Sequence, residues 1–293
     1  MHAYLIIAHG KFDQLNLLLK SLDYDDNDIY VHIDLKCGDI SEKIITDGIC
    51  HANIIFVDRL SVTWGDYSQI EFELRLIEAA SVHDYEYLHL LSGVDFPVKS
   101  HKYITEFFKQ NSGKEFVHFE QNGYDQNEKY KVKYWYFLHR YVGKVKSRES
   151  IVAAILWGLI YVQKMIGIDR TQNENYKLFK GANWFSITGD FAKYLCSQKS
   201  YIKNRFRYTH CGDEFFLQTV LMNSRFAENL YDKSFSNNYD GCLRFIDWKR
   251  GNPYIFRKDD FEQLVNSKSL FGRKFDIDVD SEIIYKLLEK FED

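Results

Sequence analysis

The sequence predicts an α/β fold, in which a mostly parallel central sheet is flanked by helices, and three observations support this. Hydrophobic residues make up 45% of the 293-residue chain and charged residues 27%, which is enough apolar material for a sizeable core. Short apolar runs alternate along the chain with segments whose apolar residues recur at helical spacing. Strands and helices that alternate in this way typically form a parallel sheet covered by helices.

The first half supplies four predicted strands and the helices between them. The strands are continuous apolar runs, as expected for strands buried on both faces, at residues 3–9, 28–34, 54–57 and 87–91. Leucines recur at helical spacing in residues 12–22, and isoleucine, leucine and phenylalanine do so in residues 67–80. Both segments are therefore predicted helices.

The second half continues the alternation and ends on an amphipathic helix. Residues 115–120 and 181–188 are predicted strands, while 189–195 and 281–291 are predicted helices. No internal repeat, low-complexity segment or proline-rich linker divides the chain. We therefore expect one domain over residues 1–293.

Polar and turn-forming residues follow the predicted strands at their carboxyl ends. His9 and Asp34 end the first two strands, and the turns at 62–65 and 92–97 follow the next two. Open parallel sheets bind ligands beyond these ends, so we expect these residues on one rim of a binding site. Neither a GxGxxG motif nor a Walker lysine loop is present, so a dinucleotide site and a P-loop phosphate site are both unsupported.

Composition excludes several other classes. The net charge of −4 argues against nucleic-acid binding as the main function. Five scattered cysteines without metal-ligand spacing indicate free thiols in a reducing compartment. Met1 leads straight into an apolar strand, so no signal peptide is expected. We predict a cytoplasmic protein, and the high Lys, Asn, Ile and Tyr content is compatible with a bacterial source.

Residues 124–149 are rich in Tyr, Lys and Arg, and they indicate a long excursion from the sheet that could act as a lid. The apolar run 151–162 follows and is too short to span a bilayer. Helices that are apolar on all sides are usually core, so burial is the favoured interpretation. Preceding basic residues, together with Trp157 and Tyr161, leave peripheral membrane contact as the alternative.

The stretch 208–221 places two adjacent carboxylates, Asp213 and Glu214, at the start of an apolar helical pattern. Free backbone N–H groups and the positive end of the helix dipole favour carboxylates at such a position. A glutamate on this rim could accept a proton from a substrate hydroxyl. Taken alone, the pair more often only stabilises its helix, with Asp213 as the N-cap.

Several short segments along the chain favour the catalytic interpretation of Glu214, because together they resemble one family. The chain is similar to the core-2/I-branching enzymes, the β-1,6-N-acetylglucosaminyltransferase family that also contains the peptide O-xylosyltransferases (glycosyltransferase family 14). The resemblance runs from the first strand to Asp276 and implies a GT-A-type nucleotide-sugar fold. The segments that carry it are Ala8-His9, Val31–Asp34, Val62–Gly65, Leu90–Pro97, Gly181–Phe185, Gly212–Glu214, Phe245–Trp248 and Arg273–Asp276.

The resemblance implies a role for individual residues. Glu214 takes the place of the catalytic base, and Lys274 that of a lysine that grips the donor diphosphate. A partner arginine is expected upstream: Arg250 is the first candidate, and the spacing leaves Arg257 open. The residues that fall where the family holds the nucleoside are Ile7, Asp34 and Trp64. Glu120 and Trp248 fall where it holds the acceptor sugar, so residues 1–120 are the expected nucleotide-binding half and 121–293 the acceptor-binding and catalytic half.

Each of these residues also has a structural interpretation. Trp248 could be a core tryptophan, Lys274 a solvated lysine, and Glu120 the end of a strand. No DxD occurs at the usual metal position, and the segment after residues 88–91 holds one carboxylate, Asp95. The DxD patterns within 276–280 are interpreted as a turn and a cap, so no metal site and no cofactor is expected.

Together, these observations predict an inverting, metal-independent glycosyltransferase. It would move a sugar from a UDP-sugar to a hydroxyl of a glycan or lipid-linked oligosaccharide acceptor. N-acetylglucosamine is the first candidate for that sugar, with xylose or another sugar as alternatives. We expect a role in bacterial surface polysaccharide synthesis, with possible peripheral contact on the inner face of the cell membrane through residues 151–162. A catalytically silent sugar- or nucleotide-binding module and a metal-dependent nucleotidyltransferase are the rival hypotheses.

Overall fold

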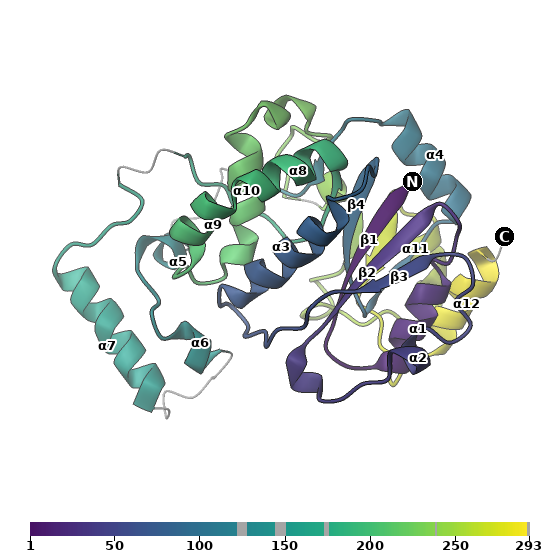
Figure 1. Ribbon diagram of the computed structural model, residues 1–293, viewed down its shortest axis with the longest axis horizontal. Coiled ribbons are helices and arrows are strands. Elements are labelled where there is room, and N and C mark those ends of the chain that lie inside the picture. The colour runs from purple at the N-terminus through teal and green to yellow at the C-terminus, as the bar shows by residue number, and fades with distance from the viewer. Residues whose placement is uncertain (122–127, 144–150, 173–175, 238, 292–293) are drawn as a thin grey trace.

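The computed structural model describes residues 1–121, 128–143, 151–172, 176–237 and 239–291 (Figure 1). Its main sheet has six strands in the order β3-β2-β1-β4-β7-β6. Their bounds are β1 His2–Ala8, β2 Asn27–Ile33, β3 Asn53–Phe56, β4 Tyr87–Ser92, β6 Phe116–Val117 and β7 Phe185–Thr188. The pairs β1–β2, β1–β4 and β2–β3 are parallel, and β7 runs antiparallel to both β4 and β6. The predicted α/β fold class is confirmed, because a mostly parallel central sheet is flanked by helices.

Side chains of β1 alternate between two hydrophobic clusters, one on each face of the sheet. Ala3 and Leu5 pack into one cluster, and Tyr4, Ile6 and Ala8 into the other. A strand buried on both faces has to be apolar at every position, which is why its sequence is a continuous apolar run. Helices α3 Ser68–Ala80, α8 Gly189–Ser197 and α10 Phe216–Met222 cover the first cluster, and α1 Phe12–Lys20, α4 His101–Gln110 and α12 Glu282–Phe291 cover the second (Figure 1).

The remaining helices are short, with one exception. They are α2 Glu42–Ile45, α5 Lys129–Lys133, α6 His139–Val142, α7 Ile151–Met165, α9 Lys199–Phe206 and α11 Phe261–Val265. Single turns of 3-10 helix lie at η1 Leu35–Cys37, η2 Gly212–Glu214, η3 Arg225–Asn229, η4 Asp240–Cys242 and η5 Lys258–Asp260. All five cysteines are free thiols, as predicted.

A second sheet of three short strands was not predicted. Strand β9 Phe271–Arg273 pairs antiparallel with β5 Asp95–Pro97 and parallel with β8 Arg244–Ile246. The buried guanidinium of Arg244 joins this sheet to the main one, since it donates to the backbone oxygens of Leu90 and Phe185 at 3.2 and 2.7 Å. This joint holds the small sheet at the carboxyl end of β4.

Two strand predictions were too long. The strand expected at 115–120 is reduced to β6, and Glu115 forms an isolated bridge with Leu230. The strand expected at 181–188 begins only at Phe185. Gly181, before it, lies against the backbone of His118, where an added Cβ would meet the carbonyl oxygen at 1.8 Å. The four helices predicted at 12–22, 67–80, 189–195 and 281–291 are confirmed, with bounds that differ by at most two residues.

The favoured interpretation of residues 151–162 as a core helix is wrong. Helix α7 does form, but it buries only Ala153, Leu156, Ile160 and Gln163, while the rest of its length is exposed or half-buried. The chain leaves the main sheet after β6 and returns at β7, through α5, α6 and α7, and the excursion predicted for residues 124–149 falls within this stretch. The lid interpretation also rests on residues 122–127 and 144–150, which lie outside the described residues.

Candidate active site

The residues expected at the nucleoside lie at the carboxyl ends of β1 and β2. The carbonyl of Ile7 accepts a hydrogen bond from the Gly93 N–H at 2.9 Å. The Asp34 carboxylate accepts from the backbone N–H groups of Lys36 at 2.9 Å and Val62 at 3.4 Å. That second bond ties the 62–65 turn to the end of β2 and leaves Trp64 44% exposed beside it.

Glu214 lies in η2, one turn before the long run of core residues. The predicted core side chains are all buried: Phe215, Phe216, Val220 and Leu221. Instead of one continuous helix, the chain makes a 3-10 turn that Cys211 opens with a left-handed φ of 50°, and α10 starts at Phe216. The carbonyl of Glu214 accepts from the Gly181 N–H at 2.9 Å, and its side chain is 33% exposed. The turn therefore presents the carboxylate to solvent above a packed core.

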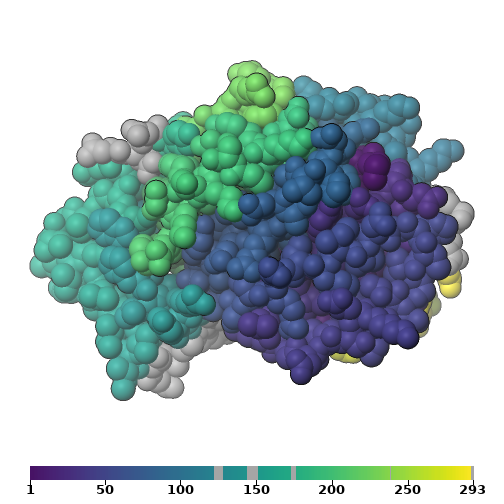
Figure 2. Space-filling model, viewed as in Figure 1, coloured from purple at the N-terminus to yellow at the C-terminus, as the bar shows by residue number. Residues whose placement is uncertain are grey.

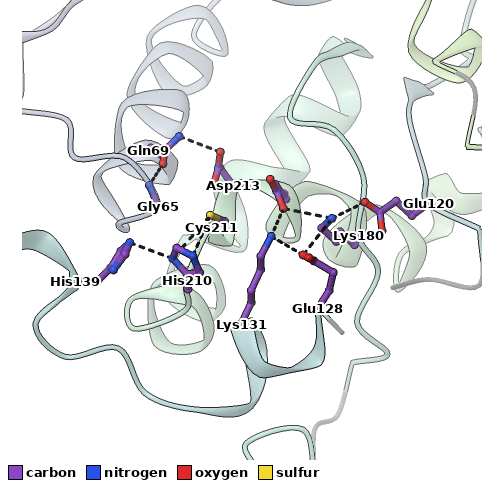
Figure 3. Close-up of polar contacts among 11 residues, drawn as sticks. Gly65, Gln69, Glu120, Glu128, Lys131, His139, Lys180, His210, Cys211 and Asp213 are labelled. Carbon is purple, nitrogen blue, oxygen red and sulfur yellow. Dashed lines mark hydrogen bonds and ion pairs between the residues drawn. The ribbon is translucent and has the colours of Figure 1, made fainter. Parts of the chain in front are cut away.

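Two lysines converge on the Glu214 carboxylate. The Nζ atoms of Lys131 and Lys180 lie 3.1 and 3.5 Å from Oε2 of Glu214. Both lysines also contact Glu128, and Lys180 forms a further ion pair with Glu120 (Figure 3). The network thus contains three carboxylates and two ammonium groups, and it links the predicted base to a predicted acceptor residue.

Electrostatics keeps the two lysines charged despite their burial. Burial alone would lower the pKa of Lys131, but the carboxylates of Glu214 and Glu128 outweigh it and raise this pKa above its usual range. The pKa of Lys180 is also raised, because Glu214 and Glu120 again outweigh burial. Two ammonium groups therefore orient the Glu214 carboxylate at neutral pH.

Asp213 is not the N-cap that its position suggested. It is 6% exposed, and its Oδ2 accepts from Nε2 of Gln69 at 3.0 Å, while Oε1 of Gln69 accepts from the Gly65 N–H (Figure 3). Burial first, and then the charge of Glu214, raise the pKa of Asp213 to about 7. Glu73, fully buried on α3, has its pKa raised by burial and by Asp213. Gln69 thus connects the 62–65 turn with the turn that carries the predicted base.

The two residues expected at the acceptor lie near one another around Tyr239. The indole of Trp248, half-exposed, is hydrogen-bonded to the Tyr239 hydroxyl. Burial raises the pKa of Tyr239, and the nearby charge of Glu120 also raises it, whereas that of Lys180 lowers it. The Tyr239 ring stacks on His118 with centroids 4.5 Å apart. The structure therefore excludes a core role for Trp248 and groups it with Glu120 and the lysine network.

Lys274 follows β9 beside the carboxyl end of β4. Its neighbour Arg273 donates to the Ser92 hydroxyl at 2.6 Å and pairs with Asp95 at 2.7 Å. On its other side, the Phe275 N–H donates to the carbonyl of Val94 at 2.9 Å. The two flanking anchors place Lys274 on the same edge of the main sheet as Ile7 and Asp34.

The two candidate arginines have different surroundings. The Arg250 guanidinium is held by Asp247 at 2.5 Å and Asp260 at 2.6 Å, and it stacks over Tyr254. Arg257 is exposed and forms no ion pair with another described residue. Both exposed arginines therefore remain candidates, and they differ in that the guanidinium of Arg250 is already held by two carboxylates.

The carboxylates of the DxD patterns already have partners. Asp276 and Asp278 both bind the ammonium group of Lys11, and Oδ1 of Asp276 accepts from the Asp278 N–H at 3.1 Å. Asp280 accepts from the Ile283 N–H at 3.2 Å at the start of α12. The turn-and-cap interpretation is confirmed. Across the described part of the chain, no three His, Cys, Asp or Glu side chains are grouped as a metal site.

Sequence reasoning missed Lys131, Lys180, Glu128 and Gln69. Lys180 immediately precedes the Gly181–Phe185 segment, which is the one available signal for it. Nothing in residue type or spacing separates the other three from ordinary surface residues. Their roles arise from contacts between residues far apart in the sequence.

Comparison with known proteins adds to this geometry. The Core-2/I-Branching enzyme family model matches residues 2–264. Xylosyltransferase 2 of Rattus norvegicus is 25% identical over 302 residues, which cover 96% of this chain and 32% of that protein. The Homo sapiens beta-1,3-galactosyl-O-glycosyl-glycoprotein beta-1,6-N-acetylglucosaminyltransferase is 25% identical over 310 residues, or 95% of this chain and 66% of that protein.

The chain spans about a third of the length of the xylosyltransferases it matches. A crystal structure of mouse xyloside xylosyltransferase 1 in its apo form aligns with a TM-score of 0.41 and 10% identity, over 93% of this chain and 97% of that chain. The family model covers most of the chain and includes Glu214 and both acceptor-side residues. This protein therefore belongs to the Core-2/I-branching enzyme family.

Proposed function

We propose that this chain is an inverting, metal-independent glycosyltransferase that moves a sugar from a UDP-sugar to a hydroxyl of a glycan acceptor. One observation carries the proposal. The partly exposed Glu214 carboxylate lies in one charge network with Glu120, next to the Trp248 surface. A base within the acceptor surface is what an attacking hydroxyl requires.

The proposed reaction is a single displacement. The acceptor oxygen attacks the anomeric carbon from the face opposite the diphosphate, and the bond from that carbon to the phosphate oxygen breaks. Glu214 takes the hydroxyl proton, and UDP leaves with the bonding electron pair. Lys274, with Arg250 or Arg257, would balance the charge that develops on the diphosphate. The anomeric configuration is inverted as a result.

The proposal assigns the donor to residues 1–120 and the acceptor to residues 121–293. Ile7, Asp34 and Trp64 would hold the nucleoside, since they share the carboxyl rim of the sheet. Two named relatives support the choice of sugar: one is a xylosyltransferase and the other an N-acetylglucosaminyltransferase. We propose N-acetylglucosamine first, with xylose as the alternative.

We further propose a cytoplasmic role in cell-surface polysaccharide synthesis, on a lipid-linked oligosaccharide. The structure supplies one supporting feature, the exposed apolar face of α7. Within the described residues, no helix is both long and apolar enough to cross a bilayer.

The test is UDP release over a panel of UDP-sugars with EDTA present, for wild type, Glu214→Gln and a matched control. Glu228→Gln is that control, since Glu228 is a surface glutamate whose ion-pair partner among the described residues is the exposed Lys233, at 3.4 Å. We expect release from one sugar, unaffected by EDTA and reduced by ~10²–10⁴-fold in Glu214→Gln alone. Folded Glu214→Gln with normal turnover would refute the base assignment. Release abolished by EDTA would favour the metal-dependent rival, and UDP binding without any transfer would favour the silent binding module.

A further inference from the structure

Helix α7 presents apolar side chains to solvent along most of its circumference. Seven large hydrophobic residues of α7, and Ile166 just after it, have exposed fractions between 39% and 78%; they are Ile151, Ile155, Trp157, Leu159, Tyr161, Val162, Met165 and Ile166. Lys164 is the one charged residue within the helix. Surface helices ordinarily turn a polar face to water, so a continuous apolar face marks an interaction surface.

The structure fixes the orientation of this helix. The side chain of Gln163 is buried and binds both backbone groups of Trp135, accepting from the N–H at 2.8 Å and donating to the carbonyl at 3.0 Å. Leu156 and Ile160 pack in a small cluster with Tyr134 and Tyr136. These contacts hold the opposite side of α7 against the protein, so the apolar face is held toward solvent.

Helix α7 and residues 134–142, against which it packs, form a lobe at one end of the molecule. Figure 1 shows α7 at the far end of the molecule from β3 and α12, and Figure 2 shows the same teal segment as a projection on the left of the surface. Contact through α7 would therefore involve the end of the molecule opposite β3 and α12.

Charge identifies the kind of partner. The described residues 128–143 and 151–172 contain six Lys or Arg and two Asp or Glu, so they have a net charge of +4 in a chain whose net charge is −4. Two copies that met through this lobe would bring like charges together, which opposes self-association. An anionic surface complements both the positive charge and the apolar face.

The residue types suit a lipid interface. Trp157 and Tyr161 combine an apolar body with a polar edge, which favours the headgroup level. Lys164 can extend its ammonium group to lipid phosphates while its stem lies along apolar surface. At about 1.5 Å per residue the helix is too short to cross a bilayer, so it would lie in the plane of the membrane.

We propose that the exposed face of α7 docks this protein on a membrane surface that carries anionic lipids. The inference does not require glycosyl transfer, since docking needs neither donor nor Glu214. A failure of docking and a failure of the proposed activity are therefore distinguishable in separate assays.

The test is flotation with phosphatidylcholine vesicles, with and without phosphatidylglycerol, at low salt. Two variants of the full chain are compared: Ile155→Glu with Val162→Glu on the exposed face, and Ile44→Glu with Val82→Glu as the matched control. All four positions are at least half exposed. We expect wild type and control to float with anionic vesicles, and the α7 variant to partition at least ~10-fold more weakly.

Tryptophan fluorescence gives a second readout that requires no charge substitution. Anionic vesicles should shift wild-type emission to the blue, and Trp157→Phe should lose most of the shift while it still floats. Wild type that fails to float with anionic vesicles would overturn the proposal, as would an α7 variant that floats like the control. Dimerisation abolished by the α7 variant, without flotation, would assign the face to a second copy instead.

Discussion

Replacing Asp213 with asparagine should change how the stability of this protein depends on pH. The carboxyl group is buried, and burial together with the neighbouring Glu214 raises its pKa to about 7. In an unfolded chain the pKa of aspartate is about 3.9. The folded state therefore binds the Asp213 proton more tightly than the unfolded state does. As the pH rises from about 3.9 to about 7, the unfolded chain loses this proton first, and the free energy of unfolding falls. Above about pH 7 both states are ionised, and the free energy of unfolding falls no further.

The size of the effect follows from these two pKa values. Because the two pKa values differ by about three, the free energy of unfolding is lower by roughly 4 kcal/mol once Asp213 is ionised in both states. About 1.5 kcal/mol of this is already present near pH 5, so the change between about pH 5 and pH 8 is at most ~2.5 kcal/mol. Coupling to the buried Glu73 makes ~2 kcal/mol the working expectation, because the pKa of Glu73 falls once Asp213 carries no charge.

The assay is urea unfolding of wild type and Asp213→Asn at several pH values, with the exposed Asp39→Asn as control. The new amide leaves a buried N–H₂ without a partner, which costs ~1–3 kcal/mol at every pH. The test is therefore how the difference in free energy of unfolding between wild type and Asp213→Asn changes with pH. Asparagine should gain relative stability as pH rises, and a difference that stays constant to within ~0.5 kcal/mol would refute the account of the buried carboxyl.

Three further changes probe the site. Gln69→Leu should lower turnover ~10-fold without unfolding the protein, because it cuts the link between the 62–65 turn and the buried aspartate; unchanged steady-state kinetics would count against that link. Gly181→Ala should destabilise by ~3 kcal/mol or more, since its Cβ would lie 1.8 Å from a carbonyl oxygen, whereas Gly158→Ala meets nothing within 4 Å and should be neutral or stabilising in thermal unfolding. Lys180→Met should raise the acceptor KM ~10-fold or more, because Glu120 loses its ammonium partner, and an unchanged KM would contradict the network.

The main sheet could be predicted from sequence because its strands are buried on both faces. Such strands leave an unmistakable apolar run, as at β1 and β2. The second sheet could not be predicted, since β5, β8 and β9 are three residues each, shorter than any periodicity test can resolve.

The candidate site divides in the same way. Glu214 and Trp248 could be proposed because they occur in short, ordered segments that resemble a family. Lys131 could not, since its function depends on a carboxylate 83 residues away. The misjudged helix α7 has a related cause: composition reports how apolar a helix is, and only the fold shows which sides are covered.

The Arg244 joint has a consequence for how acceptor preference could diversify. Its guanidinium fastens β8 to β4 and β7, and the Tyr254 N–H closes on the carbonyl of Asp247 at 2.8 Å. The segment that carries Trp248 is therefore a closed loop between fixed ends. The loop also carries Arg250, whose guanidinium is held by Asp247 and Asp260. Under the proposed function, side chains of this loop other than Arg250 could be exchanged to recognise a different acceptor, while the fixed ends keep the strands beneath in place.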